Sequence, residues 1–332
     1  SAVPVSRKVF DHKELQYIVD SALDGWFTTG RFNTEFEKKL ASYVGVNKVL
    51  TVNSGSSANL LAVSALSDAS WGAKAIQPGD EFITTPVSFP TTINPFLLYG
   101  LKPVFVDCEL QTYNIDVDLI ESAITPKTKA IMVAHTMGNP YEVDRIVAIA
   151  KKHNLKVIYD AAHCFGVQYK GQSVFEYGDI STCSFHATKL FHTGEGGAVF
   201  CKDETLRHQI YYSHNFGHNG PLDFHGLGIN GKISELHAAM GLSVLPYMDE
   251  IIESRKKTVE WYQSRIDFTK KKSIKLKENS TWNYSYYPIV FENENQLLQK
   301  LQELNAININ PRRYFYPSLN TIPYVKGKPM PV

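Results

Sequence analysis

The amino-acid sequence predicts an α/β protein, with a mainly parallel sheet in a large domain and a small α+β domain at the C-terminus. Residues 48–205 alternate short apolar runs with segments of helix length, and strands separated by such helices imply right-handed crossovers between parallel strands. After residue 232 the order changes to a long helical stretch and then strand, helix and strand. We therefore expect an N-terminal arm and large domain over residues 1–235, and linking helices and the small domain over residues 236–332.

The composition is that of a globular protein with no strong charge bias. The chain has 332 residues, of which 43% are hydrophobic and 20% are charged, and its formal net charge is +1. A near-neutral balance argues against a nucleic-acid or membrane-surface partner, because both favour an excess of basic residues. The sequence has no apolar run of about 18 residues, the length that a membrane span needs, and residues 1–16 carry no apolar signal core. The sequence therefore predicts a cytoplasmic protein.

The spacing of cysteine and histidine predicts no metal site. The four cysteines form no C-x-x-C pair and match neither zinc nor iron–sulfur spacing, so we interpret them as free thiols. The H-x-x-x-H pair at His214 and His218 lies in a segment rich in glycine and asparagine rather than in a helix.

The N-terminal segment predicts two helices, over residues 11–25 and 33–45. The second is expected to begin at Asn33, a residue type that can cap a helix, and to end at Gly45. Between the two helices, residues 26–32 form a break that carries hydroxyl groups and a glycine.

The central segment predicts strands and helices in alternation. Ligands collect at the carboxyl ends of the strands in such sheets, so side chains at those ends are candidates for a site. Strands are expected at residues 48–54, 80–89, 102–108, 128–138, 156–166, 179–187 and 196–203, and helices at 55–66, 90–100 and 142–154.

The C-terminal part begins with a polar connection over residues 206–232, and connections of this length are usually functional or disordered. The last residues close no element, so we expect that a further segment follows Val332. The other elements expected here are a helical stretch at 233–266 with a break at Pro246, a strand at 283–291, a helix at 294–306 and a strand at 307–315.

A turn of small residues follows the first strand of the central segment. The strand is expected to end at Asn53, and the backbone N–H groups of Ser56 and Ser57 then open a helix. A helix N-terminus with unpaired amides binds phosphate or another anion. A helix cap with additional serines explains the same residues equally well, and the turn is not a P-loop because it lacks G-K-[ST].

Two ionisable side chains follow later strands. Asp160 ends an apolar strand and His163 comes three residues later; a carboxylate buried there needs a cationic partner or strong hydrogen bonds, although a helix-capping Asp is an equal alternative. Lys189 stands between Ser184 and a glycine-rich run. A lysine is most often a solvated surface charge, but in a partly desolvated pocket its pKa falls and it can form a Schiff base.

These features occur in a fixed order along the chain: the phosphate-binding turn, Phe89, Asp160, and then Ser184 and Lys189. An acid that pairs with a pyridinium nitrogen, a lysine that forms an imine and a phosphate cup together describe pyridoxal phosphate chemistry. Phe89 is placed to stack on the ring, although a phenylalanine taken alone is more often a core residue.

Further motifs cover essentially the whole chain: GWFTTGRFNTEFEKKLASYVG, NSGSSANLLA, TPVSFPTTINP, KPVFVDCELQTYNID, YDAAHCFG, CSFHATKLFHTGEGGA, GLGINGKISELHAAMG and PRRYFYP. Together they resemble the DegT/DnrJ/EryC1/StrS family of sugar aminotransferases, which have the aspartate-aminotransferase type I fold of pyridoxal-phosphate-dependent transferases. That family uses pyridoxal 5′-phosphate to move an amino group, generally from glutamate, onto a keto sugar attached to a nucleotide.

The resemblance implies a role for each matching position. Lys189 matches the lysine that binds the cofactor covalently and shuttles the proton, and Asp160 matches the acid that keeps the pyridinium protonated. His163 falls where the family places a His or Gln against the 3-hydroxyl of the ring. The phosphate contacts and the stacking aromatic are expected from Ser56, Ser57, Ser184 and Phe89.

The resemblance also implies a homodimer whose neighbouring subunit completes each active site, through the segment aligned with GINGKISE. Asn230 is then expected to contact the cofactor, and Lys232 the substrate, from the partner chain. The other positions expected on the substrate side are Thr28, Thr29, His186, Arg312, Arg313 and Tyr314.

The reaction implied is transamination of a dTDP- or UDP-linked 4-keto-6-deoxyhexose with glutamate as donor, in O-antigen, lipopolysaccharide or another deoxyamino sugar pathway; a 3-keto sugar stays open. NSGSSANLLAVSAL, SFPTTINP and AHTMGNP also look like the 3-dehydrases of 4-keto-6-deoxyhexoses, which carry His where the aminotransferases carry Lys. Lys189 favours transamination. A regulator with this fold is expected to have lost Asp160 or Lys189, and the motifs NSGSSANLLA and GEGGA speak against another type I enzyme.

Overall fold

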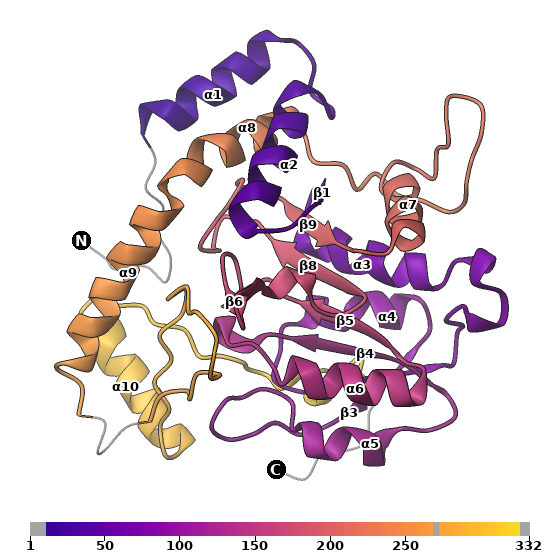
Figure 1. Ribbon diagram of the computed structural model, residues 1–332. Helices are drawn as coiled ribbons and strands as arrows, with labels where there is room; N and C mark the ends of the chain where they lie inside the picture. Colours follow the sequence, from indigo (N-terminus) through magenta and orange to yellow (C-terminus); the bar gives the residue numbers. More distant parts are fainter. Residues whose placement is uncertain (1–10, 268–271, 326–332) are drawn as a thin grey trace.

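A seven-stranded, mainly parallel sheet forms the centre of the protein (Figure 1). The computed structural model describes residues 11–267 and 272–325. The strand order is β1-β9-β8-β5-β4-β2-β3; four neighbouring pairs are parallel, and β9 runs antiparallel to both of its neighbours. The predicted fold class is therefore confirmed. The strands are β1 Leu50–Val52, β2 Glu81–Thr84, β3 Lys102–Phe105, β4 Thr128–Ala134, β5 Lys156–Asp160, β8 Ile180–Ser184 and β9 Gly197–Phe200.

The central strands are buried on both faces, as is usual for parallel strands covered by crossover helices. In β4, Ile131 and Val133 face one hydrophobic core, whereas Ala130 and Met132 face the other, because successive side chains of a strand point to opposite sides. Helices α2, α6 and α8 contribute to the first core, and α3, α4 and α7 to the second. The carboxyl ends of the parallel strands β2, β4, β5 and β8 lie together at one edge of the sheet, between the helices that cover its two faces.

The helices of the described residues agree with most of the predicted ones. Those predicted at residues 55–66 and 294–306 have the predicted bounds, and the stretch at 233–266 divides at a 3-10 turn, Leu245–Tyr247. The helices are α1 His12–Leu23, α2 Arg31–Val44, α3 Gly55–Leu66, α4 Asn94–Leu98, α5 Ile120–Ala123, α6 Val143–His153, α7 Glu204–Ser213, α8 Glu235–Val244, α9 Met248–Gln263 and α10 Glu294–Ala306; a short hairpin joins β6 Gln168–Tyr169 to β7 Gln172–Ser173.

The predicted start of the second helix is wrong. Helix α2 begins at Arg31 after Gly30, so Asn33 lies inside its first turn and does not cap it. The carboxylate of Glu235 caps the helix from a distance in the sequence. It accepts hydrogen bonds from the backbone N–H groups of Gly30 at 2.7 Å, Phe32 at 2.8 Å and Asn33 at 2.9 Å, and a negative charge is favourable at a helix N-terminus.

The connection predicted at residues 206–232 is also wrong in its first part, because α7 occupies Glu204–Ser213. Asp203 caps this helix by accepting a hydrogen bond from the N–H of Leu206 at 2.9 Å. The side chains of Leu206 and Ile210, one turn apart, enter the second core.

The two strands predicted at residues 283–291 and 307–315 do not form. Among the described residues of these segments, Val290 makes one isolated bridge, to Lys272. Pro288 and Pro311 have no N–H to donate to a ladder, and Tyr286 and Phe315 pack against His163 of the large domain instead, as described below. The domain boundary at residue 235 stays a prediction, and residues 326–332, on which the expectation of a following segment depends, lie outside the described residues.

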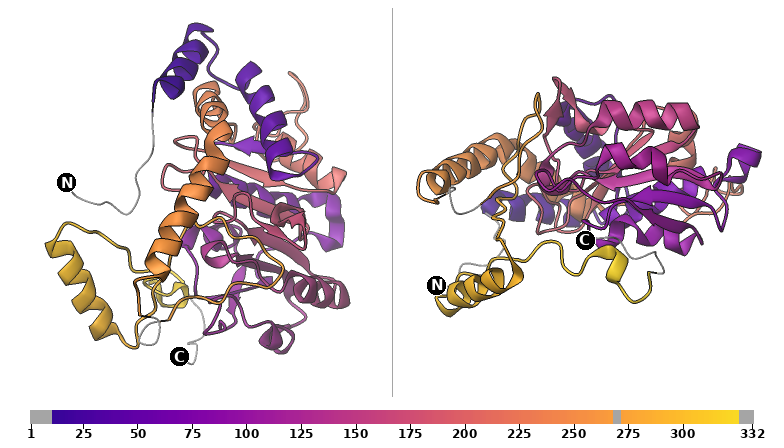
Figure 2. Two further views of the ribbon diagram at one scale, coloured as in Figure 1. Left: turned by 60° about the vertical axis from the view of Figure 1, so that its left-hand side comes forward. Right: turned by 90° about the horizontal axis from the view of Figure 1, so that it is seen from below.

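Figure 2 shows α10 standing away from the sheet, while the chain after it returns to the sheet. At that return Leu319 is fully buried in the second core and donates its N–H to the carbonyl of Pro86 at 3.0 Å. The C-terminal segment is thereby anchored just beyond β2, and the residues before Leu319 are held over the carboxyl ends of the strands.

Candidate active site

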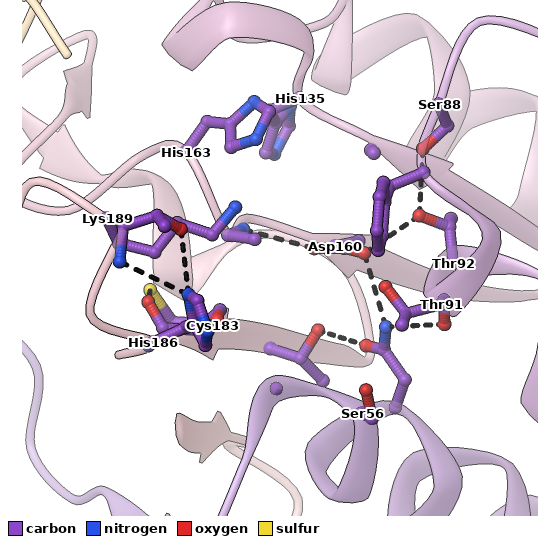
Figure 3. Close-up of a pocket in the computed structure, with 18 of the residues that line it drawn as sticks. Ser56, Ser88, Thr91, Thr92, His135, Asp160, His163, Cys183, His186 and Lys189 are labelled. Carbon is purple, nitrogen blue, oxygen red and sulfur yellow. Dashed lines mark hydrogen bonds between the residues drawn. The ribbon is translucent and has the colours of Figure 1, made fainter. Parts of the chain in front are cut away.

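A pocket of about 370 Å³ opens at the carboxyl ends of the central strands (Figure 3). The C-terminal segment, which here means residues 283–291 before α10 and 307–319 after it, lines one side of the pocket through Tyr286, Tyr314 and Phe315. Side chains predicted separately from the sequence meet here, although they come from elements far apart in the chain. The predicted residues that line the pocket are Ser56, Phe89, Asp160, His163, Ser184, His186, Lys189, Arg312 and Tyr314.

Asp160 is the last residue of β5 and is only 6% exposed. One carboxylate oxygen, Oδ2, accepts hydrogen bonds from Thr92 Oγ1 at 2.9 Å and Asn59 Nδ2 at 3.2 Å. The other, Oδ1, accepts the backbone N–H of Ala162 at 3.1 Å. These partners all donate to the carboxylate. Asp160 therefore presents a carboxylate surrounded by donors to the floor of the pocket.

Lys189 lies in the loop between β8 and β9, and its side chain reaches into the pocket toward Asp160 and His163 (Figure 3). The two residues that follow Lys189 in this loop, Leu190 and Phe191, are buried and hold the loop against the core. Burial lowers the pKa of Lys189, and the nearby Asp160 carboxylate opposes this effect in part. A lowered pKa increases the fraction of neutral amine, which is the form that acts as a nucleophile or base.

His163 is held between the large domain and the C-terminal segment. Its ring lies 4.4 Å from that of Tyr286 and parallel to that of Phe315 at 6.2 Å, measured between ring centroids. The amide of Asn283 donates to the carbonyl oxygens of His163 at 2.9 Å and Phe165 at 3.0 Å. Burial lowers the pKa of His163, and Lys189 adds to the effect, so the imidazole is neutral. Its buried Nδ1 has no hydrogen-bond partner among residues 11–267 and 272–325.

The N-terminus of α3 forms a cradle of backbone with little side chain. A Cβ placed on Gly55 would lie 2.8 Å from the Cβ of Ser184, and one on Gly197 would lie 2.7 Å from the N of Gly55. Distances this short exclude any side chain, so β8, β9 and the start of α3 pack closely only because both residues are glycine. A helix N-terminus that opens into a pocket beside serine hydroxyls fits a phosphate group.

The serines of this turn differ in what they do. Ser54 caps α3, and its Oγ accepts the N–H of Ser57 at 3.0 Å. The amide of Ser57 is therefore used inside the helix, and Ser57 does not line the pocket. Ser56 is exposed and lines the pocket together with Ser184 from the end of β8.

Aromatic and basic side chains surround the mouth of the pocket. Phe89 is 57% exposed, which is unusual for a core residue and suits a ring that stacks on a bound molecule. Arg312 also lines the pocket, with one guanidinium nitrogen 3.4 Å from the hydroxyl of Tyr314. His186 Nδ1 lies 2.8 Å from Thr188 Oγ1 and its Nε2 lies 3.5 Å from a carboxylate oxygen of Glu195.

Thr28, Thr29, Asn230 and Lys232 do not line the pocket of their own chain. The two threonines lie on the loop before α2. The segment that contains Asn230 runs beside the end of β1, where Asn53 Nδ2 donates to the Asn230 carbonyl at 2.8 Å. The ammonium of Lys232 donates to Asn215 Oδ1 at 2.7 Å, and burial lowers the pKa of Lys232.

Glu235 joins these two segments. Besides capping α2, it donates its own N–H to the carbonyl of Phe27 at 3.2 Å. The loop with Thr28 and Thr29 is therefore fixed to the start of α8, immediately after Lys232. Arg313, also expected on the substrate side, pairs with Glu294 at 2.8 Å and does not line the pocket.

Sequence reasoning missed several residues of the pocket. Asn59 and Thr92 contact Asp160, and Tyr286 and Phe315 contact His163. Asn59 carried a signal, because it is a polar residue inside an otherwise apolar stretch of helix, and a buried amide needs partners. The two aromatic residues lie in segments whose pattern predicts strands, so their positions beside His163 could not be recognised from that pattern.

The part of the chain that the structure describes contains no group of three or more His, Cys, Asp or Glu arranged to hold a metal ion. Within the same residues, no helix has both the length and the apolar character needed to cross a membrane.

Comparison with known proteins gives one family. Residues 9–330 match the DegT/DnrJ/EryC1/StrS aminotransferase family. The lipopolysaccharide biosynthesis protein RfbH of Salmonella typhimurium is 40% identical, over 98% of this chain and 81% of the relative. A dTDP-4-amino-4,6-dideoxy-D-glucose transaminase of Shigella dysenteriae is 42% identical, over 87% and 77%. A dTDP-4-dehydro-2,6-dideoxy-D-glucose 3-dehydratase of Saccharopolyspora spinosa is 37% identical, over 76% and 60%.

Solved structures with the same fold include sugar aminotransferases. DesI, determined in the presence of its TDP-sugar product, superposes with a TM-score of 0.88 at 28% identity, over 100% of this chain and 83% of DesI. A putative sugar aminotransferase of Streptococcus pneumoniae, Spr1654, in a form that contains PLP, gives a TM-score of 0.88 at 25% identity, over 97% and 87%.

Proposed function

The chain belongs to the DegT/DnrJ/EryC1/StrS aminotransferase family, and from that premise we propose that it moves the amino group of L-glutamate onto the 4-keto carbon of a dTDP- or UDP-linked 6-deoxyhexose. The protein is an aminotransferase that uses pyridoxal 5′-phosphate. The observation that carries the proposal is the meeting of Lys189 and Asp160 in one pocket with the backbone cradle at Gly55 beside them.

The residues of the pocket fit this cofactor. The cradle at Gly55 suits its phosphate, with Ser56 and Ser184 as hydroxyl donors. Asp160 is the buried anion that a protonated ring nitrogen needs. The unpartnered Nδ1 of His163 is a buried polar atom available to the ring hydroxyl. When bound, pyridoxal phosphate supplies an electron sink and a carrier for the amino group.

Lys189 carries out the proton movement in this proposal. Its neutral amine takes a proton from the Cα of the amino donor and returns one to the sugar carbon that receives nitrogen. The lowered pKa of Lys189, which results from its burial, increases the unprotonated fraction of the amine. Phe89 and Tyr286 line the same pocket and supply apolar surface beside the reacting atoms.

Dehydration at C3 is the second candidate, because one relative bears the name of a 3-dehydratase. The resemblance to those enzymes places His where this chain has Lys189. A lysine there binds the cofactor covalently and supplies the base for transamination, and this residue favours the aminotransferase over the dehydratase.

A substrate panel tests the proposal. The purified holoenzyme is incubated with L-glutamate and a set of 4-keto and 3-keto sugars linked to dTDP, UDP, GDP or CDP, and the products are read by mass spectrometry and NMR. We expect an amino sugar with nitrogen at C4 and an equivalent amount of 2-oxoglutarate. A 3-deoxy product without glutamate consumption would support the dehydratase, and nitrogen at C3 would move the assignment to a 3-keto sugar.

We also propose that the enzyme is a cytoplasmic homodimer in which Asn230 and Lys232 act in the active site of the partner subunit. Complementation tests this arrangement. Lys232→Ala and Lys189→Ala chains, each weakly active alone, are expected to regain about a quarter of wild-type activity when co-expressed in equal amounts, because each mixed dimer then has one intact site. Mixed dimers no more active than the parents would show that Lys232 acts within its own chain.

A further inference from the structure

The carboxylate of Asp160 is held by a network that extends beyond its direct partners. Its Oδ2 receives two hydrogen bonds, from Thr92 and Asn59, whereas its Oδ1 receives one, from the Ala162 backbone. A carboxylate oxygen has two acceptor positions. Oδ2 is therefore saturated, and Oδ1 is the oxygen with capacity for a donor on a bound molecule.

Proton counting gives the direction of the Thr92 branch. The Thr92 hydroxyl has one proton, and it must be given to Asp160, because a carboxylate has none to donate. Ser88 Oγ lies 2.8 Å from Thr92 Oγ1, so the Ser88 hydroxyl is the donor of that second bond. The chain of bonds runs from Ser88 through Thr92 to Asp160, and each hydroxyl polarises the next.

The Asn59 branch has a fixed direction as well. The hydroxyl of Thr182 donates to Asn59 Oδ1, and Asn59 Nδ2 then donates to both Asp160 Oδ2 and the carbonyl of Thr91 at 3.0 Å. A flipped amide would place its oxygen against the carboxylate. The Asp160 carboxylate and the Thr91 carbonyl can only accept, so they determine that the NH₂ group of Asn59 faces Asp160, and the Thr182 hydroxyl holds this orientation by donating to the amide oxygen.

We propose that Asn59 and Thr92 are positioning residues that keep Asp160 ionised and turn its Oδ1 toward the ring nitrogen of the cofactor, with Thr182 and Ser88 orienting them. Both arms of the network deliver only donors to the carboxylate, and all four side chains line the pocket. A hydrogen bond to an ionised acceptor is stronger than one to a neutral carboxylic acid, so each of these donors stabilises the carboxylate over its protonated form. The network therefore biases the shared proton toward the ring nitrogen.

The variants Thr92→Val and Asn59→Leu remove one donor each at nearly constant volume. The readout is the pH midpoint of the visible absorption band of the holoenzyme. A ring with less positive charge lets the nitrogen bound to Lys189 hold its proton to higher pH, so each midpoint is expected to rise by about half a pH unit or more. Thr182→Val is expected to give a smaller rise, because it only releases the amide of Asn59.

Two controls separate this effect from a structural one. Thr84→Val makes the same change at a fully buried threonine of β2 whose hydroxyl has no hydrogen-bond partner among the described residues, and its midpoint is expected to match the wild type. Reconstitution with pyridoxal phosphate methylated on the ring nitrogen fixes the positive charge, and it should abolish the difference between variants and wild type. The ionisable residues that interact electrostatically with Asp160, namely Lys189, Tyr141, Cys164 and Cys183, are unchanged throughout.

An unchanged midpoint in both Thr92→Val and Asn59→Leu would overturn the proposal, as would a shift that persists with the methylated cofactor. The proposal rests on the proposed function only through its cofactor. The spectra need no sugar, so a wrong sugar assignment would leave the expected shifts intact, whereas failure of the network would leave the substrate panel intact.

Discussion

Replacing Lys189 with alanine is expected to lower kcat by about three orders of magnitude or more, because the change removes both the covalent attachment of the cofactor and the base that moves the proton. The variant should still bind the cofactor through the cradle at Gly55 and the Asp160 carboxylate. Single-turnover kinetics with glutamate measures the loss, and borohydride reduction followed by peptide mass spectrometry should no longer fix the cofactor to the chain.

A control variant and a rescue experiment show whether the loss of activity is specific to the Lys189 amine. Lys202→Ala removes an exposed lysine just after β9 that pairs with Glu176, and its activity is expected to equal that of the wild type. A small amine such as methylamine, added to Lys189→Ala, should restore part of the rate, because it replaces the missing base. A Lys189→Ala protein that completed many turnovers without added amine would disprove the assignment.

Replacing Asp160 with asparagine is expected to lower the rate of the half-reaction with glutamate by about two to three orders of magnitude. The side chain keeps its shape, but the negative charge that favours a protonated ring nitrogen is lost. Whichever way its amide is turned, the NH₂ group faces a donor, either Thr92 and Asn59 on one side or the backbone N–H of Ala162 on the other, so a fall in melting temperature is expected too.

The methylated cofactor separates the two effects of this substitution. It carries its own positive charge, so it should recover much of the lost rate in Asp160→Asn. The melting temperature of the Asp160→Asn apoprotein, which contains no cofactor, should stay below that of the wild-type apoprotein. Asp160→Glu, which keeps the charge but displaces it, should fall between wild type and Asp160→Asn. A rate for Asp160→Asn within a factor of two of the wild type would contradict the role given to this carboxylate.

Local patterns in the sequence were sufficient where one element is stabilised by its own residues. The helices at 55–66 and 294–306 have their caps, Ser54 and Asn293, and their apolar residues within one short segment. The start of α2 could not be predicted in this way, because its cap is the side chain of Glu235, about 200 residues away. The absence of the two C-terminal strands could not be predicted for the same reason, because Tyr286 and Phe315 pack on His163, which is far from them in the sequence.

The sequence by itself determined the fold class, the order of the strands along the chain and the chemical types that follow them: a carboxylate at Asp160, an amine at Lys189 and small residues around Gly55. These are consequences of local periodicity and of where apolar runs end. Only the tertiary structure decided which groups touch Asp160 and that His163 is buried and neutral. Hydrogen bonds and desolvation act over a few ångströms, and Asn59 and Asp160, which are 101 positions apart, come within that range only in the folded chain.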